Sequence, residues 1–477
     1  MKRDRPTGRA GGRAGGGRAG GGGRTGGPPR RRSQRVTGAR DVALQILLAA
    51  ESRSAYSDRL LETRLRESRL SSSDSALVTA LVQGTLRNRA HLDHHLSAFT
   101  NGGFEGLPAA IRAALRLGAF QIMFLTRVPD SAAVDESVEL AKTYGHPGTA
   151  GIVNAVLRRL ARGERAPLPD ANVDLAGNLA VLHSHPRWLV ERWMKHYGPE
   201  EAARLLASDN VEPSVSVRAN AHRVRPHALA AALRAEGHET TPGPNGGPVL
   251  LVERGYVASR SPLFREGSLS LQDEAESAVV MILDPKPGER VLDLCAAPGG
   301  KSSQIAERVA PGGEVVALER HASRARALRE NLVHRLRLPG VSVACGDGRN
   351  PPFARPFDRV LVDAPCTGLG TLRRRADARW RKEERSIAEM AVLQGALLGA
   401  AAPLTRSGGV LVYSVCSLEP EETDEIVDMF LRAHPEFTRE NARPFLPPGF
   451  AAEEPVLRAF PHRHGTDGVF AARLRRR

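Results

Sequence analysis

The chain has 477 residues, which is too long for one compact core and predicts two or three domains. Its formal net charge of +15 is concentrated at the start: residues 1–40 hold twelve Lys or Arg against one acid, which gives +11 and leaves +4 for the rest. Four cysteines without metal-ligand spacing argue against a zinc site or a disulfide framework. We therefore expect no bound metal. No apolar run approaches the length of a membrane span, and the few cysteines fit a reducing compartment, so we expect a cytoplasmic protein.

Residues 1–37 form an Arg- and Gly-rich segment that we expect to be a disordered tail. Between residues 8 and 27 it contains only glycine, arginine, alanine and threonine, which cannot bury enough apolar surface to fold. Its charge would let it hold phosphate backbones by releasing counterions, and a solubilising extension would have the same composition. Composition leaves both roles open.

Residues 38–163 carry apolar side chains at helical spacing and are predicted to form an all-helical domain. Helix breaks are expected at residues 71–74, where a side chain can cap the next helix, at 101–103 and at 145–147. Most basic side chains of these helices are expected on solvated faces, although a cluster on one face would suit RNA. These basic side chains include Arg87, Arg89, Arg116, Arg158 and Arg159.

Residues 163–177 are rich in Pro, Asp and Asn and are predicted to be a linker. Residues 178–280 then mix an amphipathic helix with short strands and turn-rich segments, so we expect a small α+β subdomain that links the larger units and contributes to RNA binding. Trp188 and Trp193 are expected to pack rather than to stack on bases, because aromatic side chains carry a large apolar area.

Residues 281–477 alternate strands with helices and are predicted to form a doubly wound, Rossmann-like α/β domain. The expected strands are 290–294, 314–318, 341–344, 358–363, 410–414 and 468–474, with helices from about 302, from about 323, near 387–402 and from 420. Ligands of such sheets bind outside the carboxyl ends of the strands. The predicted fold class is therefore multidomain, with an all-α domain, a small α+β subdomain and an α/β domain.

The first of these strands ends in a glycine-rich loop, Asp-Leu-Cys-Ala-Ala-Pro-Gly-Gly-Lys at 293–301. Glycines let the backbone approach a ligand, and the amides of a following helix face negative groups. The loop differs from the phosphate-loop motif G-x-x-x-x-G-K-[ST] only at the first glycine, so a phosphate-loop NTPase is one alternative. Glu319, at the end of the second strand, favours an adenosyl ligand because its carboxylate can accept both ribose hydroxyls. Asp347, after the third strand, could accept from an adenine amino group or cap a turn.

Two cysteines follow the fourth and fifth strands: Cys366 comes after 359–363 and Cys416 after 410–414. Each alone is more often a buried apolar residue. A thiolate can add to an electron-poor ring, and a second thiol can help to dismantle the adduct, so the pair indicates covalent catalysis. If the two strands are neighbours, both thiols face the crevice of the glycine-rich loop. Asp363 can hydrogen-bond a ring nitrogen or an exocyclic amine there.

Three segments, at 293–301, 363–370 and 413–422, resemble the signature segments of the RNA cytosine-5 methyltransferases that use S-adenosylmethionine. The helical segments 115–121, 132–136 and 153–159 resemble the NusB-like RNA-binding domain. In combination, roughly residues 38–475 resemble the bacterial 16S ribosomal RNA cytosine-5 methyltransferase B family, also called RsmB, Sun or Fmu. Two residues depart from the family pattern: Glu319 replaces the usual Asp, and Val415 replaces a common Thr.

The resemblance implies methyl transfer from S-adenosylmethionine to carbon 5 of a cytosine in 16S ribosomal RNA. Cys416 is implied as the nucleophile for carbon 6, Cys366 as the thiol that assists elimination, and Asp363 and Lys301 as residues that orient the base. The glycine-rich loop would hold the methionine part of the cofactor, Glu319 its ribose and Asp347 its adenine. The implied cofactor-binding residues are Cys295, Ala296, Ala297, Pro298, Gly299, Gly300, Lys301, Glu319, Asp347 and Asp363.

Two further functions stay open beside this one. The substrate could be transfer RNA, and the chain could be a non-catalytic RNA-binding factor. The target nucleotide does not follow from the residues, because base choice depends on surface shape and on how the RNA is splayed into the site. We expect RNA as the partner, neither a membrane nor a metal, and a monomer.

Overall fold

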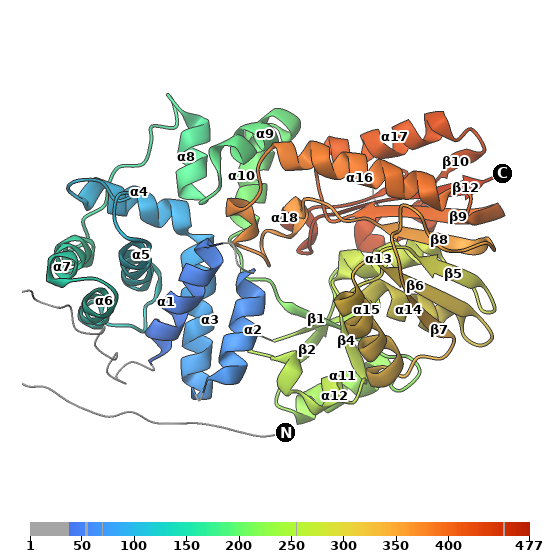
Figure 1. Ribbon diagram of the computed structural model, residues 1–477, viewed down its shortest axis with the longest axis horizontal. Coiled ribbons are helices and arrows are strands. Elements are labelled where there is room, and N and C mark those ends of the chain that lie inside the picture. Colours follow the sequence, from blue (N-terminus) through green and yellow to red (C-terminus); the bar gives the residue numbers. More distant parts are fainter. Residues whose placement is uncertain (1–37, 53–55, 69, 254, 452–453) are drawn as a thin grey trace, which may run out of the picture. The chain divides into compact units, whose positions relative to one another are not determined.

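The computed structural model describes residues 38–52, 56–68, 70–253, 255–451 and 454–477, so the predicted tail lies outside the described residues. Figure 1 shows the chain coloured along the sequence. Among the described residues, no helix is both long enough and apolar enough to cross a membrane.

The amino-terminal part of the described chain is helical, as its apolar spacing predicts (Figure 1). Its helices are α1 (Ala39–Glu51), α2 (Ser57–Glu67), α3 (Ser72–Arg87), α4 (Arg89–Phe99), α5 (Ala109–Phe124), α6 (Asp130–Tyr144) and α7 (Pro147–Ala161). Ser71 caps α3 by accepting a hydrogen bond from the Asp74 amide at 3.1 Å, which confirms the break expected at this position.

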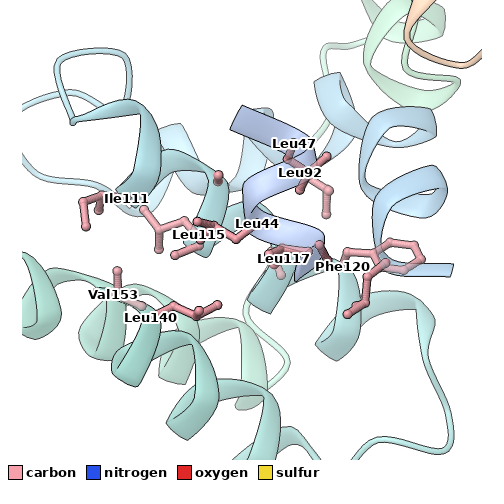
Figure 2. Close-up of a cluster of buried hydrophobic side chains, with 14 of the residues drawn as sticks. Leu44, Leu47, Leu92, Ile111, Leu115, Leu117, Phe120, Leu140 and Val153 are labelled. Atoms are coloured by element: carbon pink, nitrogen blue, oxygen red, sulfur yellow. The ribbon is translucent and has the colours of Figure 1, made fainter. Parts of the chain in front are cut away.

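These helices bury one continuous apolar core, which Figure 2 shows around α1 and α5. Leu44, Leu115 and Leu117 are fully buried in it, and a fully buried leucine stabilises a fold by about 1.5–3 kcal/mol. Gly84 lets α3 approach α5, because a Cβ at this position would lie 1.9 Å from Cζ of Phe120. The core therefore depends on close helix packing as well as on apolar area.

Two of the basic side chains expected on solvated faces lie elsewhere. Arg116 is only 5% exposed and donates to Asp93 at 2.6 Å, because a buried guanidinium needs a carboxylate partner. Arg87 donates to the backbone carbonyl of Arg373 at 3.2 Å. The solvated-face expectation is therefore wrong for Arg116, and Arg87 contacts the carboxy-terminal half of the chain.

The middle of the chain contains three helices and then a small antiparallel sheet in the order β2-β3-β1-β4. Its elements are α8 (Leu175–Leu182), α9 (Arg187–Tyr197), α10 (Pro199–Ser208), β1 (Val215–Ala219), α11 (Pro226–Ala235), β2 (Thr240–Pro242), β3 (Val249–Val252), α12 (Pro262–Arg265) and β4 (Leu269–Leu271). Trp193 is fully buried, which confirms it as a packing residue, and its Nε1 donates to Glu419 at 2.9 Å.

The carboxy-terminal part is built on an eight-stranded mixed sheet in the order β10-β12-β9-β8-β5-β6-β7, with β11 paired to β12. The strands are β5 (Arg290–Asp293), β6 (Glu314–Glu319), β7 (Val341–Cys345), β8 (Phe357–Asp363), β9 (Thr405–Val415), β10 (Phe437–Glu440), β11 (Leu457–Ala459) and β12 (Val469–Arg476). Strands β5 to β9 pair in parallel, whereas β10, β11 and β12 run antiparallel. Strands β10 and β11 were not predicted from the sequence, because they are short and carry charged residues.

Helices cover both faces of this sheet (Figure 1). The helices are α13 (Glu274–Leu283), α14 (Gly300–Val309), α15 (Ala322–Arg329), α16 (Arg385–Ala401) and α17 (Asp424–Ala433). Successive strand residues alternate between the faces: Val291 packs in the core under α13, α14 and α15, and Leu292 in the core under α16 and α17. Because both faces are covered, ligands have access only at the edges where strands end.

Candidate active site

The carboxyl ends of the parallel strands open into a cleft of about 830 Å³. From the glycine-rich loop it is lined by Cys295, Ala296, Ala297, Pro298, Gly300 and Lys301; from the following turns it is lined by Glu319, Asp347, Asp363, Cys366 and Cys416. Every residue predicted for the site except Gly299 therefore lines one cleft.

Gly299 serves the shape of the loop. Its φ of +104° lies in the left-handed region, and a Cβ there would lie 2.8 Å from Cδ1 of Leu328. The glycine thus lets the loop turn tightly against α15, and α14 begins at the next residue. The first residues of α14, Gly300 and Lys301, therefore line the cleft.

Asp293 is a residue of the cleft that the analysis of the sequence did not single out. It ends β5, is 1% exposed and accepts a hydrogen bond at 2.6 Å from Ser302. Its Oδ1 has no hydrogen-bond partner among the described residues, and burial raises the pKa of its carboxyl to about 7. A carboxylate directly after a buried apolar run was the available signal.

Two more acceptors lie in the same half of the cleft. Glu319 is buried, and its Oε1 accepts from the His321 amide at 2.9 Å, which leaves the second oxygen 3.4 Å from Arg324. Asp347 accepts from Arg349 at 2.6 Å, and this bond holds the pKa of the Asp347 carboxyl well below its usual range. With the orphaned oxygen of Asp293, these acceptors fit a ligand that carries an amine and hydroxyls.

The two thiols lie in contact. Strands β8 and β9 pair in parallel with Asp363 opposite Ser414, so the turns that follow them meet, and the Sγ atoms of Cys366 and Cys416 are 3.2 Å apart. The Gly370 amide also donates to the Cys416 carbonyl at 3.1 Å. The expectation that both thiols face one crevice is confirmed.

The environment of the thiols favours a thiolate on Cys416. A hydrogen bond from Cys366 lowers the pKa of Cys416, and the charges of Lys301 and Arg375 lower it further against the effects of burial and of Asp363. The same hydrogen bond and burial raise the pKa of Cys366 well above its ordinary value. Of the two thiols, Cys416 is therefore the one that loses its proton more readily.

Lys301 extends from the glycine-rich loop to the thiol side. Its Nζ donates to Asp363 at 2.8 Å and also contacts Glu276, while Ser414 donates to the other oxygen of Asp363 at 2.7 Å. The Lys301 ammonium, placed between two carboxylates, holds Asp363 in one orientation. Glu276 lies in α13, far along the chain, and no local pattern indicated its role.

A buried glutamate ties the two thiol-bearing turns together. Glu422 is fully buried and accepts from the Thr367 amide at 2.8 Å, from Gln394 at 2.9 Å and from the hydroxyl of Ser417. Thr367 and Ser417 directly follow the two cysteines. Glu422 therefore fixes both turns from behind, a contact that sequence reasoning missed.

The fold and the residues that line the cleft together indicate a class of enzyme. A Rossmann-like sheet with amine and hydroxyl acceptors at β5, β6 and β7, and a thiol pair at β8 and β9, is the arrangement of an S-adenosylmethionine-dependent methyltransferase.

The chain belongs to the 16S rRNA methyltransferase RsmB/F family, whose model matches residues 280–475. The NusB family matches residues 37–162, and a ferredoxin-like domain of RsmF/B-like methyltransferases matches residues 185–258. The predicted fold class and family are thus confirmed, the cofactor is S-adenosylmethionine, and the phosphate-loop NTPase alternative is wrong.

Curated relatives span nearly the whole chain. The probable ribosomal RNA small subunit methyltransferase B of Bacillus subtilis is 37% identical over 453 residues, covering 92% of this chain and 99% of that protein. A putative methyltransferase of Mycobacterium tuberculosis is 38% identical over 462 residues, covering 94% and 98%.

Solved structures share the fold. The crystal structure of PH0851 matches with a TM-score of 0.78 at 27% identity and covers 93% of this chain and 100% of that chain. A methyltransferase homologue from Pyrococcus horikoshii matches with a TM-score of 0.53 at 28% identity and covers 63% and 98%. In the part of this chain that the structure describes, no three His, Cys, Asp or Glu side chains are grouped to hold a metal ion.

Proposed function

We propose that this protein methylates carbon 5 of a cytosine in 16S ribosomal RNA through a covalent adduct between Cys416 and carbon 6. The observation that carries the proposal is the 3.2 Å contact between Cys366 and Cys416 in the cleft that the glycine-rich loop also lines. We assign residues 38–163 to the helical domain, 178–280 to the α+β subdomain and 281–477 to the catalytic domain.

The cofactor would lie in the half of the cleft that is rich in acceptors. The loop from Cys295 to Lys301 would hold its methionine part, Glu319 its ribose and Asp347 its adenine. The unpartnered Oδ1 of Asp293 fits the amino group of the methionine part. When bound, S-adenosylmethionine supplies an electrophilic methyl group on its sulfonium.

Cys416 begins the reaction on the RNA base. Its thiolate bonds to carbon 6 of the cytosine, and the displaced electron pair makes carbon 5 an enamine carbon that can take the methyl group. Asp363, held by Lys301 and Ser414, faces the cleft and would accept a hydrogen bond from the exocyclic amine of the base. Addition at carbon 6 is required because carbon 5 of cytosine is not nucleophilic on its own.

Cys366 completes the reaction. Once the Cys416 sulfur is bonded to carbon it accepts hydrogen bonds poorly, so the main cause of the raised pKa of Cys366 is lost. Cys366 then gives its proton to water, and its thiolate takes the proton from carbon 5. The electron pair of the carbon 5–hydrogen bond forms the carbon 5–carbon 6 double bond, and the electron pair of the carbon 6–sulfur bond returns to Cys416. This step restores the double bond and releases the methylated base.

The test uses unmodified 16S ribosomal RNA, small-subunit particles and transfer RNA, each incubated with the full chain and labelled S-adenosylmethionine. Bisulfite mapping should find one protected cytosine in the 16S RNA, and the Cys416→Ala variant should leave it unprotected. Label only in transfer RNA would contradict 16S ribosomal RNA as the substrate. Label in 16S RNA without bisulfite protection would contradict carbon 5 as the position of the methyl group. No label in any RNA would favour a non-catalytic RNA-binding factor.

A further inference from the structure

The segment that follows Cys366 is unusually basic. Residues 373–382, here called the basic segment, contain Arg373, Arg374, Arg375, Arg379, Arg381 and Lys382. The segment contains the short helix Ala378–Trp380, and it lies between the thiol turn and α16. Basic side chains gathered beside a nucleophile either form contacts within the protein or bind an anionic ligand.

Most of the basic segment is structural. Arg374 forms ion pairs of 2.7 Å with both Asp273 and Asp467. Arg379 is fully buried and donates to the Ser184 carbonyl at 2.9 Å, and Arg381 donates to the Ala50 carbonyl at 3.1 Å. These contacts reach all parts of the described chain and fix the course of the segment.

Arg375 and Lys382 are different from these anchors. Both line the cleft, Arg375 is exposed and Lys382 is half-buried. Neither side chain forms a hydrogen bond or ion pair within the part of the chain that the structure describes. The anchored neighbours thus hold in the cleft two cations that have no ion-pair partner among the described residues, and the charge of Arg375 acts on Cys416 and on Asp58.

An aromatic side chain lines the same cleft from the helical domain. Tyr56, which precedes α2, is 42% exposed, and the guanidinium of Arg381 lies 4.6 Å from the centre of its ring. An exposed aromatic ring beside cations is the combination that binds single-stranded nucleic acid, in which bases stack and phosphates meet positive charge.

We propose that Arg375, Lys382 and Tyr56 form a subsite for single-stranded RNA at the methyl-transfer cleft. Arg375 and Lys382 bind the phosphates that flank the target cytosine, and the Tyr56 ring stacks on a neighbouring base. The inference rests on the proposed function and deepens it, since a base that enters the cleft must bring its own backbone to the opening. The helical domain thereby takes part in holding the reacting nucleotide.

The experiment measures the dissociation constant and KM of unmethylated 16S ribosomal RNA at several KCl concentrations. For single strands each phosphate contact contributes about 0.7 to the slope of log affinity against log salt, so Arg375→Gln/Lys382→Gln should flatten the slope by about 1.4. We expect KM to rise about tenfold. Arg375→Lys keeps the charge and should keep the slope.

The matched control is Arg355→Gln/Lys286→Gln. It removes the same two side-chain types from positions that precede β8 and β5, at the opposite ends of those strands from the cleft. This control should keep the wild-type slope within about 0.3, well below the contribution of one phosphate contact. If the cleft variant has the wild-type slope, or if both double variants flatten it equally, the phosphate subsite is overturned.

Tyr56 is tested separately. Tyr56→Ala should weaken RNA binding about tenfold by removing a stacking surface, and Tyr56→Phe should restore it to within about twofold. Equal loss in both variants, or no loss in either, would overturn the stacking role. Failure of the wild-type chain to methylate RNA would instead contradict the proposed function. The dissociation constants, unlike KM, do not depend on turnover and would still test the subsite.

Discussion

The two halves of the cleft differ in charge. At the ends of β5, β6 and β7, the cofactor half presents Asp293, Glu319 and Asp347. At the ends of β8 and β9, the thiol half has its cysteines next to Lys301 and Arg375. A sulfonium cofactor is cationic and RNA is a polyanion, so the acceptors of the first half suit the cofactor, and Arg375 and Lys382 in the second half suit RNA. The two ligands are thus matched by different side chains of a single cavity.

The most severe way to break the thiol half is Cys416→Ala. We expect methyl transfer to fall by at least about 10⁴-fold, because no other group can add to carbon 6. Binding of S-adenosylmethionine, which belongs to the cofactor half, should change by less than about twofold. Cys345→Ala is the control, since Cys345 is exposed and outside the cleft. Activity in Cys416→Ala would contradict the assignment of the nucleophile.

Cys366→Ala should leave addition possible and block release. We expect a covalent protein–RNA adduct to accumulate, with turnover slowed by about 10²- to 10⁴-fold, the usual contribution of an acid–base group. Denaturing gel electrophoresis with labelled RNA detects the adduct. The double variant Cys366→Ala/Cys416→Ala should form none, and an adduct in that variant would place the covalent bond on another residue.

Glu319→Gln breaks the cofactor half alone. The loss of a buried charged acceptor should raise the dissociation constant of S-adenosylmethionine about 10- to 100-fold. RNA affinity should stay unchanged, and calorimetry of the apoprotein measures both. Glu330→Gln, at an exposed position after α15, is the matched control. Equal effects of the two variants would remove Glu319 from the ribose site.

The smallest expected effect is on the pH dependence of adduct formation by Cys416, which tests the electrostatics of the thiol half. Because the pKa of Cys416 is lowered, adduct formation should reach its plateau at a lower pH than an ordinary thiol, whose pKa is about 8.5. Lys301→Gln removes a cation that favours the thiolate, so the inflection should move to higher pH. Rapid-quench measurements across pH report this, with Lys286→Gln as control. A shift to lower pH would contradict the role of Lys301.

The sequence predicted the cleft better than its surroundings, and the reason is physical. Motif residues such as Lys301, Cys366 and Cys416 directly follow strands, and parallel strands bring their carboxyl ends together, so local pattern sufficed. Glu422 and the partners of Arg374 come from distant segments, and their contacts depend on packing that no local period encodes. The exposure of Arg116 was predicted wrongly because the sequence pattern of a helix does not show whether a carboxylate packs against one of its arginines.

The strands of the large sheet were predicted only in part for the same reason. The central strands are apolar because both faces are covered, which is visible in the sequence. The edge strand β10 reads Phe-Thr-Arg-Glu and pairs with β12, where Arg473 and Arg475 both donate to Glu440. Charged side chains at an edge carry no period that separates a strand from a loop.

The burial of Arg379 limits how modular this protein can be. Its guanidinium donates to the carbonyl oxygens of Ser184 and Asp209, which lie before the catalytic domain, so a fragment starting near residue 280 would expose or orphan that cation. The methyl-transferring unit could then not be cut out, or grafted onto another RNA-binding module, without rebuilding this contact. Recombination during evolution would face the same barrier, which favours inheritance of the chain as a whole.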